Sequence, residues 1–184
     1  MENEDDPGQI LVKLSDFGLA AKIDTEVGGL RGFAGTPEYM APEVVRQPGN
    51  KALPKPDPSQ VPLITQKADI FAVGVLAYEL LTGNTAFSFA CKSSLRLYSA
   101  ILRKPPQFKE EAFRTCTEDC IDFIKLCLIK EQENRPDVHE MLGHSWLMQF
   151  EEQTRANNQC SFIDNRLEMN MSFKDRIMER GLDS

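Results

Sequence analysis

The strongest constraint on the fold is an apolar stretch in the middle of this 184-residue chain. Ten of the twelve residues from 70 to 81 are apolar, and only Gly74 and Glu79 interrupt them. This pattern predicts an α-helix over residues 69–82, and the following Gly83 is a typical helix stop. Because apolar side chains surround the whole circumference, the helix is predicted to be buried on every side.

Further elements are predicted before and after this helix. The run from Ile10 to Leu14 is typical of a short strand. Thr117 is a typical N-cap because acidic residues follow it, and Pro136 suits the first position of a helix. Helices are predicted over residues 41–46, 93–103, 117–128 and 136–142, and apolar residues at helical spacing allow one more in the tail from about residue 149.

Two long stretches have no sustained period. Residues 15–40 contain five glycines and are predicted to form a long loop, a kind of segment that is usually functional in a compact domain. Residues 46–66 hold five of the eleven prolines, which excludes regular structure and predicts a surface insertion.

The net charge of −7 lies almost entirely in the first quarter of the chain. Residues 1–45 carry nine acidic and three basic side chains, whereas residues 46–184 carry 19 and 18. A nucleic-acid binder would show a basic bias instead. No apolar run reaches the roughly 18 residues of a membrane helix, and the acidic start is unlike a signal peptide. We expect a cytoplasmic protein that binds neither nucleic acid nor membrane.

Cysteine and histidine spacing argues against disulfides and zinc. Five cysteines without a Cys-x-x-Cys pair predict reduced thiols, and Cys116, Cys120 and Cys127 are predicted to be small buried side chains of a helix. His139 and His144 stand five residues apart, about 140° around a helix, and therefore cannot share a metal ion.

Four short motifs follow one another in order. They are DFG at 16–18, GTPEYMAPE at 35–43, DIFAVG at 69–74 and NRP at 134–136. A given tripeptide occurs by chance in roughly 2% of chains of this length, but the ordered set is specific. Over residues 9–148 the sequence resembles the C-terminal lobe of eukaryotic serine/threonine protein kinases, and within them the calcium/calmodulin-dependent group.

This resemblance implies a mainly α fold, with short strands near the N-terminus and then a helical bundle around one buried helix. It divides the chain into an acidic segment 1–8, a partial kinase domain 9–148 with the proline-rich insertion 46–66, and a tail 149–184. The implied activity is transfer of the γ-phosphate of ATP to protein Ser or Thr. The implied cofactors are ATP and Mg²⁺, and the implied partner is a protein substrate, which can have a basic sequence.

The resemblance also assigns roles near the nucleotide. Asp16 would hold Mg²⁺, a hard cation that requires carboxylate oxygen, and Phe17 and Gly18 would lie beside the cofactor. Thr36 would support catalysis by contacting the catalytic loop. The substrate-binding residues would be Gly35, Thr36, Pro37, Glu38, Tyr39 and Glu79, although Glu79 is equally compatible with a plain helix surface.

Three further residues are assigned structural roles by the resemblance. Glu43 and Arg135 would form a buried ion pair, and Asp69 would bind the backbone of the catalytic loop. A carboxylate beside an apolar helix needs such partners because an unpaired buried charge is costly. The usual phosphoacceptor position, four residues before Thr36, is Gly32, so we expect no phosphorylation switch at that position.

Several family motifs are absent from the 184 residues. The sequence has no glycine-rich loop, no strand Lys and no His-Arg-Asp catalytic loop. We therefore expect the chain alone to be inactive and poorly stable, since these parts act together. The alternative is a non-catalytic binding or regulatory module. The resemblance allows regulation by calcium and calmodulin, but the tail has balanced charges, whereas calmodulin targets are usually basic.

Overall fold

The computed structural model describes residues 2–3, 6–10, 13–23, 26–87, 93–108 and 111–149. Its first element is an antiparallel hairpin of β1 (Glu2–Asn3) and β2 (Asp6–Ile10). The strand predicted over residues 10–14 was wrong in position, because β2 ends at Ile10 and residues 13–14 are not in a strand; residues 11–12 lie outside the described residues. Leu14 is 89% exposed, so no described layer supports an apolar strand there.

The rest of the described chain is mainly helical, which confirms the predicted fold class. The α-helices are α1 (Pro42–Val45), α2 (Lys67–Thr82), α3 (Ser94–Arg103), α4 (Glu118–Cys127) and α5 (Val138–Leu142). Three 3₁₀ helices cover Pro37–Tyr39, Pro58–Gln60 and Glu111–Thr115, and residues 145–149 are also helical. None of the described helices is long and apolar enough to cross a membrane.

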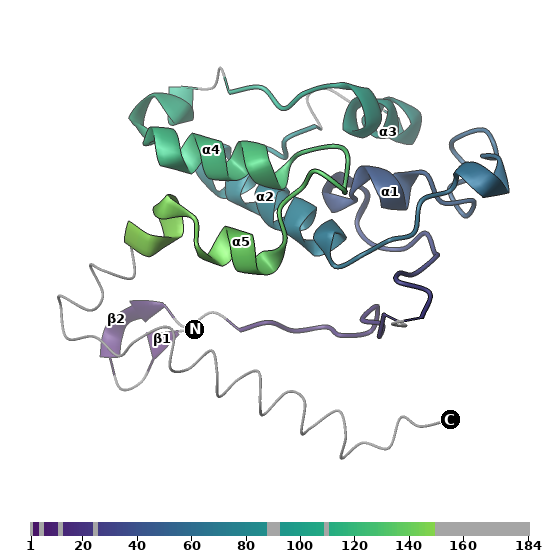
Figure 1. The fold of residues 1–184 in the computed structure, drawn as a ribbon. Coiled ribbons are helices and arrows are strands. Elements are labelled where there is room, and N and C mark those ends of the chain that lie inside the picture. Colours follow the sequence, from purple (N-terminus) through teal and green to yellow (C-terminus); the bar gives the residue numbers. More distant parts are fainter. Residues whose placement is uncertain are drawn as a thin grey trace, which may run out of the picture.

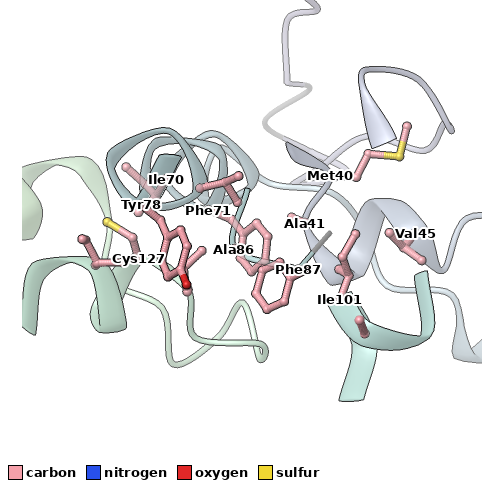
Figure 2. Packing of buried hydrophobic residues seen from close by; sticks show 14 of the residues in the cluster. Met40, Ala41, Val45, Ile70, Phe71, Tyr78, Ala86, Phe87, Ile101 and Cys127 are labelled. Carbon is pink, nitrogen blue, oxygen red and sulfur yellow. The ribbon is translucent and has the colours of Figure 1, made fainter. Parts of the chain in front are cut away.

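Helix α2 is the centre of the bundle. α4 packs along it, α5 lies below the same pair in the view of Figure 1, and α1 lies near α3. The side chains of Phe71, Val75 and Tyr78 are buried in the core that these helices share, part of which Figure 2 shows. The Tyr78 hydroxyl remains paired, because it donates a hydrogen bond to the Gln107 carbonyl at 2.7 Å.

The prediction that α2 is buried on every side was wrong. Val73, Leu76 and Leu80 are 43%, 47% and 78% exposed. Their spacing of three and four residues places them on one face of the helix, opposite the residues that enter the core. The described residues cover only one face of α2. The apolar side chains of the other face therefore stay exposed.

The helix ends follow local sequence signals. Gly83 ends α2 with a left-handed φ of 71°, and the side chain of Thr117 caps α4 by accepting a hydrogen bond from Cys120 N–H. The last helix differs from the prediction: Pro136 is not its first residue, and α5 begins at Val138. The reason is a capping box between Asp137 and Glu140. The Asp137 side chain accepts a hydrogen bond from the Glu140 N–H, and the Glu140 side chain accepts one from the Asp137 N–H, so Asp137 is the N-cap of the helix.

Two of the three cysteines predicted to be buried in a helix are small core residues of α4, whereas Cys116 precedes the helix and is only partly buried. Cys120 and Cys127 are buried free thiols. Desolvation by burial is the main reason that the pKa of Cys120 rises to about 11 and that of Cys127 to about 12. No described group of three or more His, Cys, Asp or Glu side chains could hold a metal ion.

Gly74 brings α2 and α4 into close contact. A Cβ atom at this position would lie 2.5 Å from Cys127 Cβ and 3.0 Å from the Leu128 side chain. We therefore predict that Gly74→Ala lowers the free energy of unfolding by about 1 to 3 kcal/mol through overpacking. Urea-induced unfolding followed by circular dichroism measures the change.

Gly143→Ala is the matched control for this prediction, because the new Cβ would have no neighbour closer than 3.6 Å. We expect its unfolding midpoint to stay close to that of the parent chain. Equal midpoints for all three proteins would contradict the packing argument.

Candidate active site

The segment that carries the predicted substrate residues is tied to α2 by one hydrogen bond. The Tyr39 hydroxyl donates to Oε2 of Glu79, the polar residue within the apolar run. This bond is the main reason that the pKa of the Tyr39 hydroxyl is raised, and burial and the charges of Glu79 and Glu38 add to it. Glu79 thus has a partner within the chain, which neither of its two predicted roles included.

An open cleft of about 410 Å³ lies beside this bond. It is lined by Thr36, Glu38, Tyr39 and Glu79, and by Gly83, Asn84 and Thr85 from the turn after α2. Among the described residues, two carboxylates and no cationic side chain line the cleft, so its charge suits a basic group. The structure thus brings together four of the six residues that were predicted to bind substrate.

The other two predicted substrate residues shape the backbone next to the cleft. Gly35 has a φ of 114°, a conformation that favours glycine. Pro37 begins the 3₁₀ helix, and Thr36 precedes it with extended backbone and no side-chain capping bond. The exposed Thr36 hydroxyl therefore stands at the cleft.

The ion pair expected between Glu43 and Arg135 is present and is nearly inaccessible to water. Two guanidinium nitrogens of Arg135 donate to the two carboxylate oxygens of Glu43, at 2.7 and 3.1 Å. Arg135 also donates to the carbonyls of Ile129 at 2.9 Å and Lys67 at 2.6 Å. The pair joins α1 to the start of α2 and to the loop before α5.

Lys130 is a buried amine that sequence analysis did not single out. Its Nζ atom lies 3.6 Å from the centroid of the Phe87 ring and 5.4 Å from that of Phe71, and it has no hydrogen-bond partner among the described residues. Burial and the nearby Arg135 charge lower its pKa to about 7, and Glu131 offsets part of this shift. No local pattern distinguishes this lysine from a surface lysine.

Asp16, Phe17 and Gly18 are exposed residues of segment 13–23, which runs below the helical bundle in the view of Figure 1. Asp16 has a positive φ of 60°, and its Oδ1 accepts a hydrogen bond from the Gly18 N–H at 3.3 Å. The carboxylate is exposed, which suits a Mg²⁺ ion that keeps water and phosphate oxygens as its other ligands. The structure does not bring this motif to the cleft lined by Thr36.

Asp69 lies in the first turn of α2, where a negative charge is favourable. Partial desolvation raises the pKa of its carboxyl group. Within the described part of the chain this carboxylate has no hydrogen-bond partner. Its predicted contact with a catalytic loop therefore stays a prediction.

Breaking the buried ion pair should cost far more than breaking an exposed one. We predict that Glu43→Ala lowers the free energy of unfolding by about 3 to 5 kcal/mol, because it leaves Arg135 buried without its counter-charge. Glu111→Ala removes the Glu111–Arg114 pair, whose side chains are 89% and 76% exposed, and should cost less than about 1 kcal/mol. Urea unfolding measures both, and equal losses would contradict this assignment.

Lys130 should make stability depend on pH near neutrality. Its pKa is about 7 in the folded state, against the ordinary lysine value of 10.5, so the unfolded chain binds more protons between these two pH values. Stability should therefore rise with pH, by about 1 to 2 kcal/mol from pH 7 to pH 8.5. We predict that Lys130→Met removes this rise. Lys125→Met, at an exposed lysine, should keep it, and a rise of the same size in both variants would contradict the assignment.

The comparisons with known proteins agree with the geometry. Residues 2–147 match the family described as Protein kinase domain. Serine/threonine-protein kinase 17A of Oryctolagus cuniculus is 36% identical over 138 residues, which cover 75% of this chain and 30% of the relative. Myosin light chain kinase 2, skeletal/cardiac muscle, of Bos taurus is 28% identical over 170 residues, which cover 92% of this chain and 24% of the relative.

Serine/threonine-protein kinase pakD of Dictyostelium discoideum is 32% identical over 136 residues, which cover 74% of this chain and 7% of the relative. The chain thus spans 30% or less of the length of these three relatives. The family match covers most of the chain and includes the buried ion pair and the cleft. The chain belongs to the protein kinase domain family.

Proposed function

We propose that these residues form the C-terminal part of a serine/threonine protein kinase, which transfers the γ-phosphate of ATP to a Ser or Thr side chain of a protein. The observation that carries the proposal is the segment from Thr36 to Tyr39, held against Glu79 at an open acidic cleft. The relatives named as serine/threonine-protein kinases support it. Membership of the calcium/calmodulin-dependent group, regulation by calmodulin and a cytoplasmic location are further parts of this proposal.

Each residue at the cleft has a distinct task in this proposal. The exposed Thr36 hydroxyl contacts the groups that carry out transfer, and the backbone from Gly35 to Pro37 guides the acceptor segment. Glu38 and Glu79 attract a basic side chain of the substrate, since two carboxylates line the cleft. Tyr39 holds Glu79 in place for that contact.

Asp16 is the candidate Mg²⁺ ligand of the chain. Its exposed carboxylate offers a hard anionic oxygen, and the bound ion would neutralise charge on the phosphate oxygens of ATP during transfer. The Gly18 N–H donates to Oδ1 of Asp16, so this bond leaves Oδ2 available to bind a cation. Phe17 and Gly18 would then lie beside the nucleotide.

A second function is favoured by the exposed apolar face of α2. Val73, Leu76 and Leu80 form an exposed apolar surface that a protein partner could cover. A non-catalytic module that binds kinase substrates or regulators would need only these surfaces. Enzyme assays distinguish the two functions.

The decisive assay compares the chain alone with the chain joined to a kinase N-lobe. We predict no phosphate transfer by the 184 residues alone, because the catalytic base is missing. When a glycine-rich lobe and a His-Arg-Asp loop of an active serine/threonine kinase precede it, we expect MgATP-dependent labelling of Ser and Thr in a basic peptide. Radiolabelled ATP and phosphoamino-acid analysis measure the product.

Two variants of the joined protein test the metal assignment. Asp16→Asn should lower the rate at least about 100-fold by removing a charge that the metal requires, whereas Asp57→Asn on the proline-rich segment should not change it. A folded joined protein without activity would instead favour the binding module. Equal rates for both variants would show that Asp16 does not hold Mg²⁺.

A further inference from the structure

Residues 29–33 connect the exposed DFG segment to the residues of the cleft along the chain, and we call them the docked strip. Leu30 and Ile64 exchange two backbone hydrogen bonds, each 2.8 Å long, in an isolated antiparallel bridge. Gly29 is buried beside this bridge, where an added Cβ would lie 2.7 Å from Leu63 Cβ and 2.9 Å from the Ile64 carbonyl oxygen. The start of the strip is thus pressed against the end of the proline-rich segment.

Gln47 holds the next part of the strip from the inside. This residue follows α1 and is 1% exposed, although its side chain is polar. Its Oε1 accepts a hydrogen bond from the Gly32 N–H at 3.3 Å, and its Nε2 donates to the carbonyls of Glu43 at 3.0 Å and Pro62 at 2.8 Å. One carboxamide therefore connects the strip, α1 and the proline-rich segment, with both of its ends satisfied.

Phe33 completes the attachment at the end of the strip. Its ring packs edge-to-face on Tyr98 of α3, with centroids 5.9 Å apart and an interplanar angle of 81°. Gly49 passes so close that an added Cβ would lie 2.9 Å from Phe33 Cβ. Two residues later the chain reaches Gly35 and the cleft.

We infer that Gln47 is a positioning residue of the substrate cleft: by docking the strip, it sets where the chain enters the turn at Gly35 and hence where Thr36 stands. This inference rests on the proposed function. The attachment uses main-chain groups, the Gln47 carboxamide, the Phe33 ring and the Arg31 guanidinium, which donates to the Val61 carbonyl at 3.5 Å, and residues 29–33 include no Ser, Thr or Tyr. The strip is therefore held without a phosphate group on its own side chains.

Hydrogen exchange of the full 184-residue chain tests the docking without an activity assay. Gln47→Met keeps the side-chain length but removes all three hydrogen bonds, and Gly29→Ala forces the strip away from Leu63 without touching Gln47. We expect both variants to speed amide exchange in residues 29–33 at least tenfold and to leave exchange in residues 70–78 of α2 unchanged. Gln60→Ala, at an exposed glutamine of the proline-rich segment, should change neither.

An activity assay of the joined kinase separates positioning from simple support of the fold. We expect Gln47→Met and Gly29→Ala to raise KM for the peptide about tenfold while KM for ATP stays unchanged. Unchanged exchange in the strip, or equal acceleration of the strip and α2 in both variants, would overturn the inference. Faster exchange in the strip of a joined protein that lacks activity would keep the docking but refute the proposed function.

Discussion

The buried contact between Glu43 and Arg135 is the interaction on which the rest of the structure depends. The two residues lie 92 positions apart, and the guanidinium also binds the Lys67 carbonyl at the start of α2. A buried charge without its partner is far less stable than the pair, so α1, α2 and the loop before α5 must close together. The position of α1 then fixes the backbone that carries Gln47, and the position of α2 fixes the backbone that carries Glu79. Both sides of the cleft are thus built from one electrostatic junction.

Helix α2 has apolar side chains on both its buried face and its exposed face. Its apolar circumference gave no periodic signal, because hydrophobicity alone does not separate Phe71 on the buried face from Leu80 on the exposed face. Gly74 does separate them, since only the face without a Cβ allows α4 to approach Cys127 and Leu128. The helix and its end were therefore predictable from the sequence. Its exposed face was not, because the role of Gly74 becomes visible only once Cys127 and Leu128 are placed beside it.

Local signals predicted most of the helix ends that neighbouring residues decide, with one exception at the start of α5. The N-cap at Thr117 and the stop at Gly83 depend on a few adjacent positions and were found. The start of α5 was misplaced because Pro136 was weighed without the capping box of Asp137 and Glu140, a pattern that was readable in the sequence. Among the candidate site residues, motif order identified the group at the cleft, but not its hydrogen bonds.

Gln47 was beyond such reasoning for a physical reason. Its three partners are main-chain groups of α1, the docked strip and the proline-rich segment, and main-chain groups carry no sequence signature. The proline-rich segment was predicted from composition as a surface insertion, yet Val61 and Ile64 near its end hydrogen-bond Arg31 and Leu30 of the strip, and Pro62 hydrogen-bonds Gln47. Proline content disfavours an α-helix and an extended sheet, but the prediction of no regular structure was partly wrong, because a 3₁₀ helix covers Pro58–Gln60 and Ile64 forms a single bridge.

The charges around Phe71 explain why the buried junction tolerates two basic residues. Arg135 lies 5.0 Å from the centroid of this ring and Lys130 lies 5.4 Å from it, while Glu43 is the buried carboxylate that pairs with the guanidinium. A guanidinium keeps its proton in proteins, so the lysine is the group that can relieve the excess positive charge. The lowered pKa of Lys130 follows from burial and from Arg135. Arg135 holds both carboxylate oxygens of Glu43, at 2.7 and 3.1 Å, while the Lys130 amine lies against the rings of Phe87 and Phe71.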